Sequence, residues 1–222
     1  MIAVTMPDRP KIYHIVHVDR LQSIMADGCL WCDARISKCP VLGTRIGMSH
    51  IKQRRLALKL SSHSNLHVGD CVPFYFCPRS IMLYLIYRGN DPELPYRGGQ
   101  TEIVHLEADL HDSVAWAEQN QRRWAFTLSN AGANYVEDRC DLKQLNEIDW
   151  SSVKTNKWGG NGVTPTIKEH KQAEFLIEHK FPWNLIKRIG VNSREMYQRV
   201  MTIISPSNNY RPQVEIMPTW YY

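Results

Sequence analysis

The sequence has no apolar run long enough to cross a membrane, although 43% of its 222 residues are hydrophobic. A transmembrane helix needs about 20 consecutive apolar residues. The first ten residues also lack the long apolar segment of a secretory signal peptide. We therefore expect a cytoplasmic protein with no membrane partner. A chain of this length can bury one good hydrophobic core.

Metal ligands are sparse as well. Cys29 and Cys32 have the spacing of zinc and redox sites, but no second such pair follows among the six cysteines. His63 and His67 also have ligand-like spacing, yet they lie in a polar segment that is typical of a loop. We predict free thiols in a reducing compartment and no metal site.

The chain also lacks internal repeats and a heptad seam, so we expect a monomer. The apolar pattern predicts strands at 11–18, 30–36, 70–77, 102–107, 124–128, 171–177, 186–191 and 214–217. It predicts helices at 18–27, 50–60, 82–87, 109–119, 137–145 and 193–201 and an unstructured segment at 151–165. Many short strands with few long helices indicate one α+β domain over residues 1–222.

Cap residues mark the ends of two of these helices. Asp19 is expected to begin the first helix and Gly28 to end it. Ser193 is expected to begin the last helix, with Glu195 in its first turn.

The positive charge is unevenly distributed. A net charge of +5 permits a nucleic-acid partner without requiring one. Residues 45–59 hold five basic side chains and no acidic one, which a solvated helix face would also explain. Arg54 and Arg55 point to different faces of such a helix, so they cannot perform the same task.

Glu174 is an unusual residue for its position. It stands in the segment Gln172-Ala-Glu-Phe-Leu-Ile177, whose apolar members favour burial. Burying a carboxylate costs several kcal/mol unless the group is paired. Strand alternation could equally point Glu174 toward solvent, and the residues alone leave both interpretations open.

Aromatic side chains gather in residues 72–84. Phe74, Tyr75 and Phe76 alternate between the two faces of a strand, so at least one ring is exposed or lines a cleft. Such a ring suits stacking on a flat ligand ring or on a nucleobase, and plain packing on an edge strand is the alternative. Arg79 and Ser80, which follow the strand, are candidates for holding a phosphate.

The segment before Glu174 interleaves basic and aromatic residues. Its candidate side chains for single-stranded nucleic acid are Tyr135, Arg139, Lys154, Lys157 and Trp158. In such a surface the charges follow the backbone and the rings stack on bases. Loops are usually polar in any case, so the composition alone is weak evidence.

Together with Tyr13-His14-Ile-Val-His17, these segments resemble the DarT family of bacterial DNA ADP-ribosyltransferase toxins, over about residues 12–222. The resemblance implies a single-domain ADP-ribosyltransferase (PARP-like) fold with central mixed or antiparallel β-sheets flanked by helices. It implies NAD as a substrate and no metal. It also implies single-stranded DNA and a macrodomain antitoxin (DarG-like) as partners.

The resemblance also assigns roles to residues of this sequence. Glu174 and Arg55 would be catalytic. The cofactor-binding residues would be His14, Ile15, Val16, Ser23, Trp31 and Arg55, although for the Trp31 ring we rank packing in the core first. The candidates for DNA contact are Tyr75, Tyr135, Arg139 and Trp158. Residues of about 39–57 would form an NAD-binding element, and about 130–174 a substrate-reading loop that ends at the catalytic Glu174.

The expected activity is sequence-restricted transfer of ADP-ribose from NAD to a thymine base in single-stranded DNA, which would block replication. Glu174 would stabilise the positive charge that develops on the ribose. Because arginine stays protonated, Arg55 would act electrostatically rather than as a base. The alternatives are transfer to guanine, RNA or protein, or a catalytically silent nucleic-acid-binding module.

Overall fold

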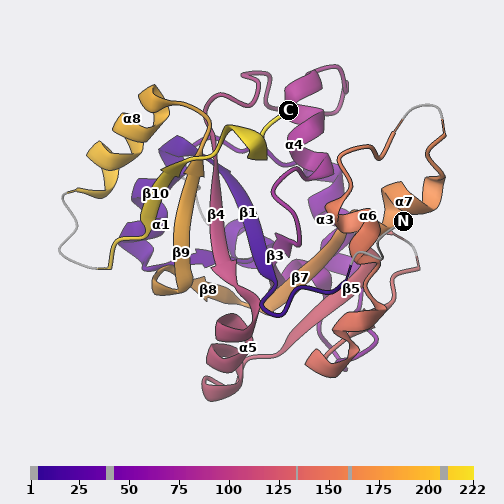
Figure 1. Cartoon of the computed structure of the whole chain (residues 1–222). Coiled ribbons are helices and arrows are strands. Elements are labelled where there is room, and N and C mark those ends of the chain that lie inside the picture. Colours follow the sequence, from indigo (N-terminus) through magenta and orange to yellow (C-terminus); the bar gives the residue numbers. More distant parts are fainter. Residues whose placement is uncertain (1–4, 39–42, 134, 160–161, 206–209) are drawn as a thin grey trace.

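The computed structural model describes residues 5–38, 43–133, 135–159, 162–205 and 210–222 (Figure 1). The strands of this part of the chain are β1 (Lys11–His17), β2 (Cys29–Trp31), β3 (Cys71–Tyr75), β4 (Ile103–Asp109), β5 (Trp124–Asn130), β6 (Asp138–Arg139), β7 (Ala173–Glu178), β8 (Lys180–Pro182), β9 (Ile186–Val191) and β10 (Gln213–Ile216). Its α-helices are α1 (Leu21–Asp27), α2 (Asp33–Ile36), α3 (Ser49–Ala57), α4 (Ile81–Arg88), α5 (Leu110–Gln119), α6 (Trp150–Lys154), α7 (Pro165–His170) and α8 (Arg194–Ile204).

These strands build one large sheet in the order β10-β9-β4-β1-β3-β7-β5-β6 and a small one from β2 and β8. β9 and β10 are parallel, and the other paired strands are antiparallel. The predicted mixed α+β fold is therefore confirmed. Every residue of β4 is buried, which agrees with its place inside the sheet.

The sheet is weakly joined between β1 and β3. β1 pairs with β4 along its whole length, from Lys11 opposite Asp109 to His17 opposite Ile103. On its other side β1 meets β3 at the pair Tyr13–Tyr75, the one registered pair between these strands in the described part of the chain. The two strands are therefore registered at this point alone in the described part of the chain, and we call this point the crossing.

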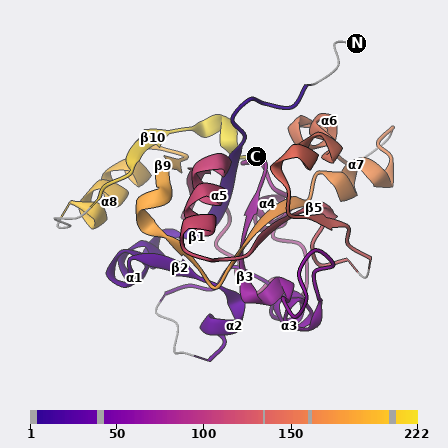
Figure 2. The same ribbon diagram turned by 90° about the horizontal axis from the view of Figure 1, so that it is seen from below.

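Helices cover the two faces of the sheet near this crossing. Figure 2 shows α2 and α3 on one side of the strands, and α6 with the N-terminal segment on the other side. Aromatic rings fill the core between the sheet and its helices; Phe74 and Phe181, for example, have ring centroids 4.4 Å apart. Each face of the crossing therefore has its own set of surrounding side chains.

Several predicted elements are confirmed by local capping. Gly28 ends α1 in the left-handed conformation with a φ of 67°, which glycine adopts without steric cost. Ser193 begins α8, and its hydroxyl accepts a hydrogen bond from the Met196 N–H group. No helix of the described residues is long and apolar enough to span a bilayer.

Other predicted elements are wrong. The strand expected at 30–36 ends at Trp31, and α2 follows because Cys32 begins a helical turn. Asp19 does not cap α1; a 3-10 turn at Val18–Arg20 comes first, and Asp19 instead accepts hydrogen bonds from Thr44.

Tertiary contacts also override the composition between residues 137 and 170. The helix expected at 137–145 is β6 followed by a 3-10 turn at Leu142–Glu147, because β6 pairs with β5. The segment expected to be unstructured at 151–165 contains most of α6 and the start of α7.

Candidate active site

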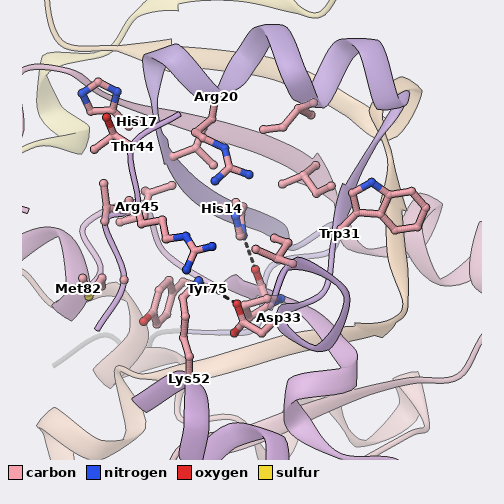
Figure 3. Close-up of a pocket in the computed structure, with 18 of the residues that line it drawn as sticks. His14, His17, Arg20, Trp31, Asp33, Thr44, Arg45, Lys52, Tyr75 and Met82 are labelled. Carbon is pink, nitrogen blue, oxygen red and sulfur yellow. Dashed lines mark hydrogen bonds and ion pairs between the residues drawn. The ribbon is translucent and has the colours of Figure 1, made fainter. Parts of the chain in front are cut away.

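A pocket of about 190 Å³ opens on the α3 side of the crossing between β1 and β3. We call it the central pocket. It is lined by residues of β1, β3, β7 and α3 together with the segments that carry Arg20 and Arg45 (Figure 3). Residues that lie far apart in the sequence meet here, so its geometry depends on the fold.

A buried ion pair lies in the wall of the central pocket. Arg55 donates from both terminal nitrogens to both carboxylate oxygens of Glu174, at 3.0 and 2.9 Å. Arg55 is 8% exposed and Glu174 is 3% exposed, whereas Arg54 is exposed. The prediction that the two arginines face different sides of the helix is therefore confirmed.

Strand pairing explains how Glu174 is aimed. Glu174 in β7 lies opposite Tyr75 in β3, so both side chains lie on the pocket side of the sheet. Its backbone N–H donates to the Thr127 hydroxyl at 3.0 Å, next to the irregular register of β5 and β7. The alternative that Glu174 faces solvent is wrong, because its carboxylate is paired inside the fold.

The charge of Glu174 also raises the pKa values of its neighbours Arg55 and Tyr75. Burial alone would lower the pKa of Arg55, but the adjacent Glu174 carboxylate raises it well above the ordinary value. Burial, reinforced by the charge of Glu174, raises the pKa of Tyr75. Both groups therefore keep their protons at neutral pH, and Arg55 remains a cation.

His14 is a neutral group on the β1 side of the pocket. Its Nδ1 lies 2.7 Å from the Pro73 carbonyl oxygen, which can only accept, so Nδ1 carries the proton. Burial lowers the pKa of His14 to about 4. The other ring nitrogen, Nε2, therefore has a lone pair that can accept a hydrogen bond.

Cationic side chains form another part of the lining of the central pocket. In Figure 3, Arg20 and Arg45 reach toward His14, and Lys52 lies beside Asp33, with which it forms an ion pair of 2.9 Å. The Arg20 Nε atom is buried and lacks a hydrogen-bond partner among the described residues. This wall can bind an anion such as a phosphate group.

Several of these residues were not predicted. Arg45 and Lys52 belong to the basic run at 45–59, whose charge was a signal, but Arg20 and Asp33 are separated from it in the sequence. The side chain of Asp19 holds Thr44 at the pocket with a hydrogen bond of 2.7 Å. No sequence pattern marks these contacts.

Most of the predicted cofactor-binding residues lie together at the central pocket. His14, Ile15, Val16, Trp31 and Arg55 line the central pocket. The Trp31 ring is half-buried at the pocket rather than part of the core, and its Nε1 donates to Asp27 at 2.9 Å. Ser23 does not line the pocket, because its hydroxyl donates to the Arg20 carbonyl at 3.0 Å.

The predicted NAD-binding element and substrate-reading loop are only partly described. Residues 39–42 of the first element lie outside the described part, and its remainder supplies Thr44, Arg45, Lys52 and Arg55 to the central pocket. Residues 134 and 160–161 of the second element also lie outside it.

Of the predicted DNA contacts, only Tyr75 lines the central pocket. Tyr135 is 95% exposed, and Arg139 forms ion pairs with Glu137 and Glu147. Trp158 is buried, and its ring packs edge-on against Tyr84 at 4.7 Å. The Trp158 ring is therefore packed against neighbouring rings, and its contact with DNA stays a prediction.

Arg79 and Ser80 have different environments. The Ser80 hydroxyl accepts from the Leu83 N–H group and begins α4, so its role in holding a phosphate stays a prediction. Arg79 lies at a second pocket on the α6 side of the sheet.

The cysteines do not form a metal site in the described part of the chain. Cys29, Cys32, Cys71 and Cys77 are buried free thiols, Cys140 is an exposed one, and Cys39 lies outside the described residues. These residues contain no group of three or more potential metal ligands.

Comparison with known proteins identifies related sequences and structures. The model of a family described as "ssDNA thymidine ADP-ribosyltransferase, DarT" matches residues 13–222. A DNA ADP-ribosyl transferase of Thermus sp. (strain 2.9) is 34% identical over 219 residues, which cover 98% of this chain and 99% of the relative.

Solved structures agree with this similarity. The structure of Thermus sp. 2.9 DarT in complex with ADP-ribosylated ssDNA has a TM-score of 0.89 and 33% identity, and the match covers all of both chains. The complex of the same protein with NAD+ has a TM-score of 0.83 and 31% identity, and the match covers 98% of this chain and all of that one.

Proposed function

The chain belongs to the DarT family of single-stranded DNA thymidine ADP-ribosyltransferases, and from this premise we propose that the Arg55–Glu174 pair is its reaction centre. The protein is an NAD-dependent enzyme that transfers ADP-ribose to a thymine base of single-stranded DNA. The observation that carries the proposal is the buried bidentate ion pair at the wall of the central pocket.

The central pocket fits NAD in its chemistry. The pyrophosphate of NAD needs cationic donors, and Arg20 has a buried N–H group that lacks a partner among the described residues. Arg45 lies on the same wall. We assign the pyrophosphate to this wall, which leaves the nicotinamide end for His14 and the reaction centre.

Glu174 would act on the ribose next to nicotinamide. The bond between ribose C1′ and the nicotinamide nitrogen breaks, and its electron pair leaves with nicotinamide. Arg55 occupies one acceptor site on each carboxylate oxygen, so Glu174 retains lone pairs for the ribose 2′-hydroxyl. Its negative charge stabilises the cationic ribose, and this interaction strengthens as the bond breaks.

Arg55 would act on the acceptor side of the same step. A ring nitrogen of thymine forms the new bond to C1′ and releases its proton to solvent. Because Glu174 raises the pKa of Arg55, the guanidinium does not take this proton. Its positive charge instead favours the deprotonated base, and its remaining N–H groups can position the acceptor.

His14 and the neighbouring backbone of β1 would bind the nicotinamide ribose. Since Nδ1 donates to Pro73, the neutral ring offers Nε2 as an acceptor for a ribose hydroxyl. Ile15 and Val16 line the pocket beside it, so their backbone groups are candidates for the nicotinamide amide. We also assign residues of about 39–57 to NAD binding and about 130–174 to substrate reading.

A bulky charged adduct on template bases is expected to block replication, which agrees with a toxin. The macrodomain antitoxin, the monomeric state and the cytoplasmic location remain predictions.

The test is incubation of the purified chain with radiolabelled NAD and single-stranded oligonucleotides that contain or lack thymine. Label is expected only on strands that contain thymine. Matched RNA and denatured protein serve as other acceptors. Label on these acceptors alone would contradict the proposed substrate.

Glu174→Gln tests the proposed reaction centre. It keeps the size of the side chain and removes the charge, so transfer should fall by about 10²–10³-fold. Glu178→Gln is the matched control, because Glu178 ends the same strand and pairs with Arg123 outside the central pocket. Equal activity of the two variants would contradict the role of Glu174.

A further inference from the structure

A second pocket of about 350 Å³ lies on the α6 side of the crossing between β1 and β3. We call it the basic pocket, because its lining includes Arg9, Lys11, Arg79, Lys154 and Lys171 and no acidic residue. Asp109 pairs with two of these cations, Arg9 and Lys11, from outside the lining. The other three have no carboxylate partner among the described residues.

Arg79 is held in place but pairs with no carboxylate of the described residues. Its guanidinium lies 4.4 Å from the ring centroid of Tyr222, whose hydroxyl donates to the Arg79 carbonyl at 2.9 Å. The Arg79 Nε atom is buried and lacks a hydrogen-bond partner in the described part of the protein. A guanidinium fixed by stacking, with unused N–H groups at a cavity, is suited to bind a phosphate.

Lys171 adds positive charge to the same cavity. Lys171 is only 2% exposed, and its ammonium donates to the Val153 and Thr155 carbonyls at 3.0 and 2.8 Å. A buried cation without a counter-charge acts strongly on its surroundings, because the protein interior screens charge less than water does. An anion in the basic pocket would supply that missing charge.

The basic pocket is adjacent to the proposed reaction centre. Tyr13 lines both pockets, and it pairs with Tyr75, which in turn lies opposite Glu174. Lys171 precedes Glu174 by three residues, in the turn that leads from α7 into β7. An acceptor that reaches the Arg55–Glu174 pair therefore extends close to the basic pocket.

An aromatic surface next to Arg79 favours a nucleic-acid strand over a free phosphate. The ring of Tyr87 stacks on that of Tyr222 at an angle of 22°, and Tyr87 is 50% exposed. Exposed rings beside a cation that binds the backbone suit unpaired bases.

We propose that the basic pocket binds a backbone phosphate of the acceptor DNA strand, with Arg79 as its principal ligand. This inference rests on the proposed function, because it places the strand whose base is modified. Lys154 would contribute a second contact from the rim, and Lys171 would act through its buried charge. The pocket would thus position the strand relative to the Arg55–Glu174 pair.

The first test compares Arg79→Gln with Arg194→Gln, a matched charge change at an exposed residue on α8. Binding of a fluorescein-labelled thymine oligonucleotide is measured by anisotropy over a range of salt concentrations. Arg79→Gln should weaken binding by about tenfold and reduce the slope of log affinity against log salt by about 1. Arg194→Gln should match the wild type in both.

The second test locates the phosphate. A series of oligonucleotides each carries one uncharged methylphosphonate linkage in place of a phosphate. At one position near the modified thymine this change should weaken wild-type binding, and the same change should have little further effect in Arg79→Gln. Equal losses in the two proteins at every position would overturn the assignment.

Transfer kinetics separate this inference from the proposed function. Arg79→Gln should raise the KM for the oligonucleotide but not for NAD, and Arg79→Lys should recover part of the loss. If the wild type labels DNA and Arg79→Gln has an unchanged KM for DNA, the basic pocket is overturned while the proposed function stands. If Arg79→Gln weakened the binding of thymidine monophosphate but left the binding of the oligonucleotide unchanged, the assignment of a strand phosphate to the basic pocket would also be overturned.

Discussion

The central pocket and the basic pocket lie on opposite sides of one strand crossing, but they handle positive charge differently. In the central pocket Arg55 is neutralised by Glu174 and Lys52 by Asp33, while Arg20 and Arg45 form no ion pair among the described residues. In the basic pocket Arg79, Lys154 and Lys171 have no carboxylate partner among the described residues. Paired charges can be buried at the reaction centre, whereas cations without an ion pair, which both pockets contain, are suited to bind an anionic ligand.

The largest expected effect concerns the stability of the paired site. Arg55→Ala leaves the Glu174 carboxylate buried and alone, so the free energy of unfolding should fall by about 3–5 kcal/mol. The double variant Arg55→Ala/Glu174→Ala should lose less than the sum of the two single losses. Urea denaturation measures each value.

Arg123→Ala is the control for this prediction. It breaks the Arg123–Glu178 ion pair, which is partly exposed, and should cost only about 0–1 kcal/mol. Equal losses at Arg55 and Arg123 would show that burial does not distinguish the two pairs.

The next effect concerns His14 and His105, which contact carbonyl groups in β3 and in the segment after it. His14 contacts the Pro73 carbonyl at the central pocket, and His105 contacts the Pro78 carbonyl at the basic pocket. His105 is fully buried, and burial lowers its pKa from 6.5 to about 4. The unfolded chain therefore binds this proton more readily, and stability is lost as the pH falls from about 6.5 toward 4.

From pH 7.5 to pH 5, His105 should account for a loss of about 2 kcal/mol in the free energy of unfolding. Urea titrations of His105→Gln at the two pH values should lack this part of the loss, and His50→Gln, at an exposed position, should retain it. If His105→Gln lost as much unfolding free energy between these pH values as the wild type, His105 would be ruled out as a source of the pH dependence.

A smaller effect separates the two pockets by substrate. Arg20→Gln removes the unpaired donor in the central pocket and should raise the KM for NAD by about tenfold. Its KM for the oligonucleotide should stay unchanged, which is the reverse of the result expected for Arg79→Gln. Initial rates of label transfer at varied NAD and varied DNA give both constants. If each variant raised both constants equally, the two pockets would not have separate ligands.

The smallest effect tests how Arg79 is positioned. Tyr222→Phe removes the hydroxyl that accepts from the Trp158 Nε1 and donates to the Arg79 carbonyl, but it keeps the ring under the guanidinium. The KM for DNA should rise by about threefold. Tyr222→Leu also removes the ring and should raise it further. Identical values for the two variants would mean that the ring has no part in holding Arg79.

Local sequence signals determined much of the fold. Glycine at position 28 and serine at position 193 end and begin helices because their own backbone and side chain satisfy the terminal groups. The apolar segment around Glu174 forms a strand, as predicted. These signals act over a few residues, so they can be identified without knowledge of the tertiary structure. Family motifs further predicted seven of the residues that line the central pocket, including Arg55 and Glu174.

Local sequence signals gave wrong secondary structure where contacts with distant segments determined the conformation. Residues 137–145 have helical composition, but part of this segment pairs with β5 as β6. Ser80 and Arg79 are neighbours in the sequence, yet one begins a helix and the other lines a cavity.

By itself the sequence determined the family, the order of most elements and the identity of Arg55 and Glu174 as important residues. Only the tertiary structure decided that these two side chains, 119 positions apart, pair in a buried wall. It also decided that Arg79 and Lys171 share a cavity without an acidic residue in its lining. The physical reason is that charge pairing depends on strand register and on helix placement, which bring together residues that no local pattern connects.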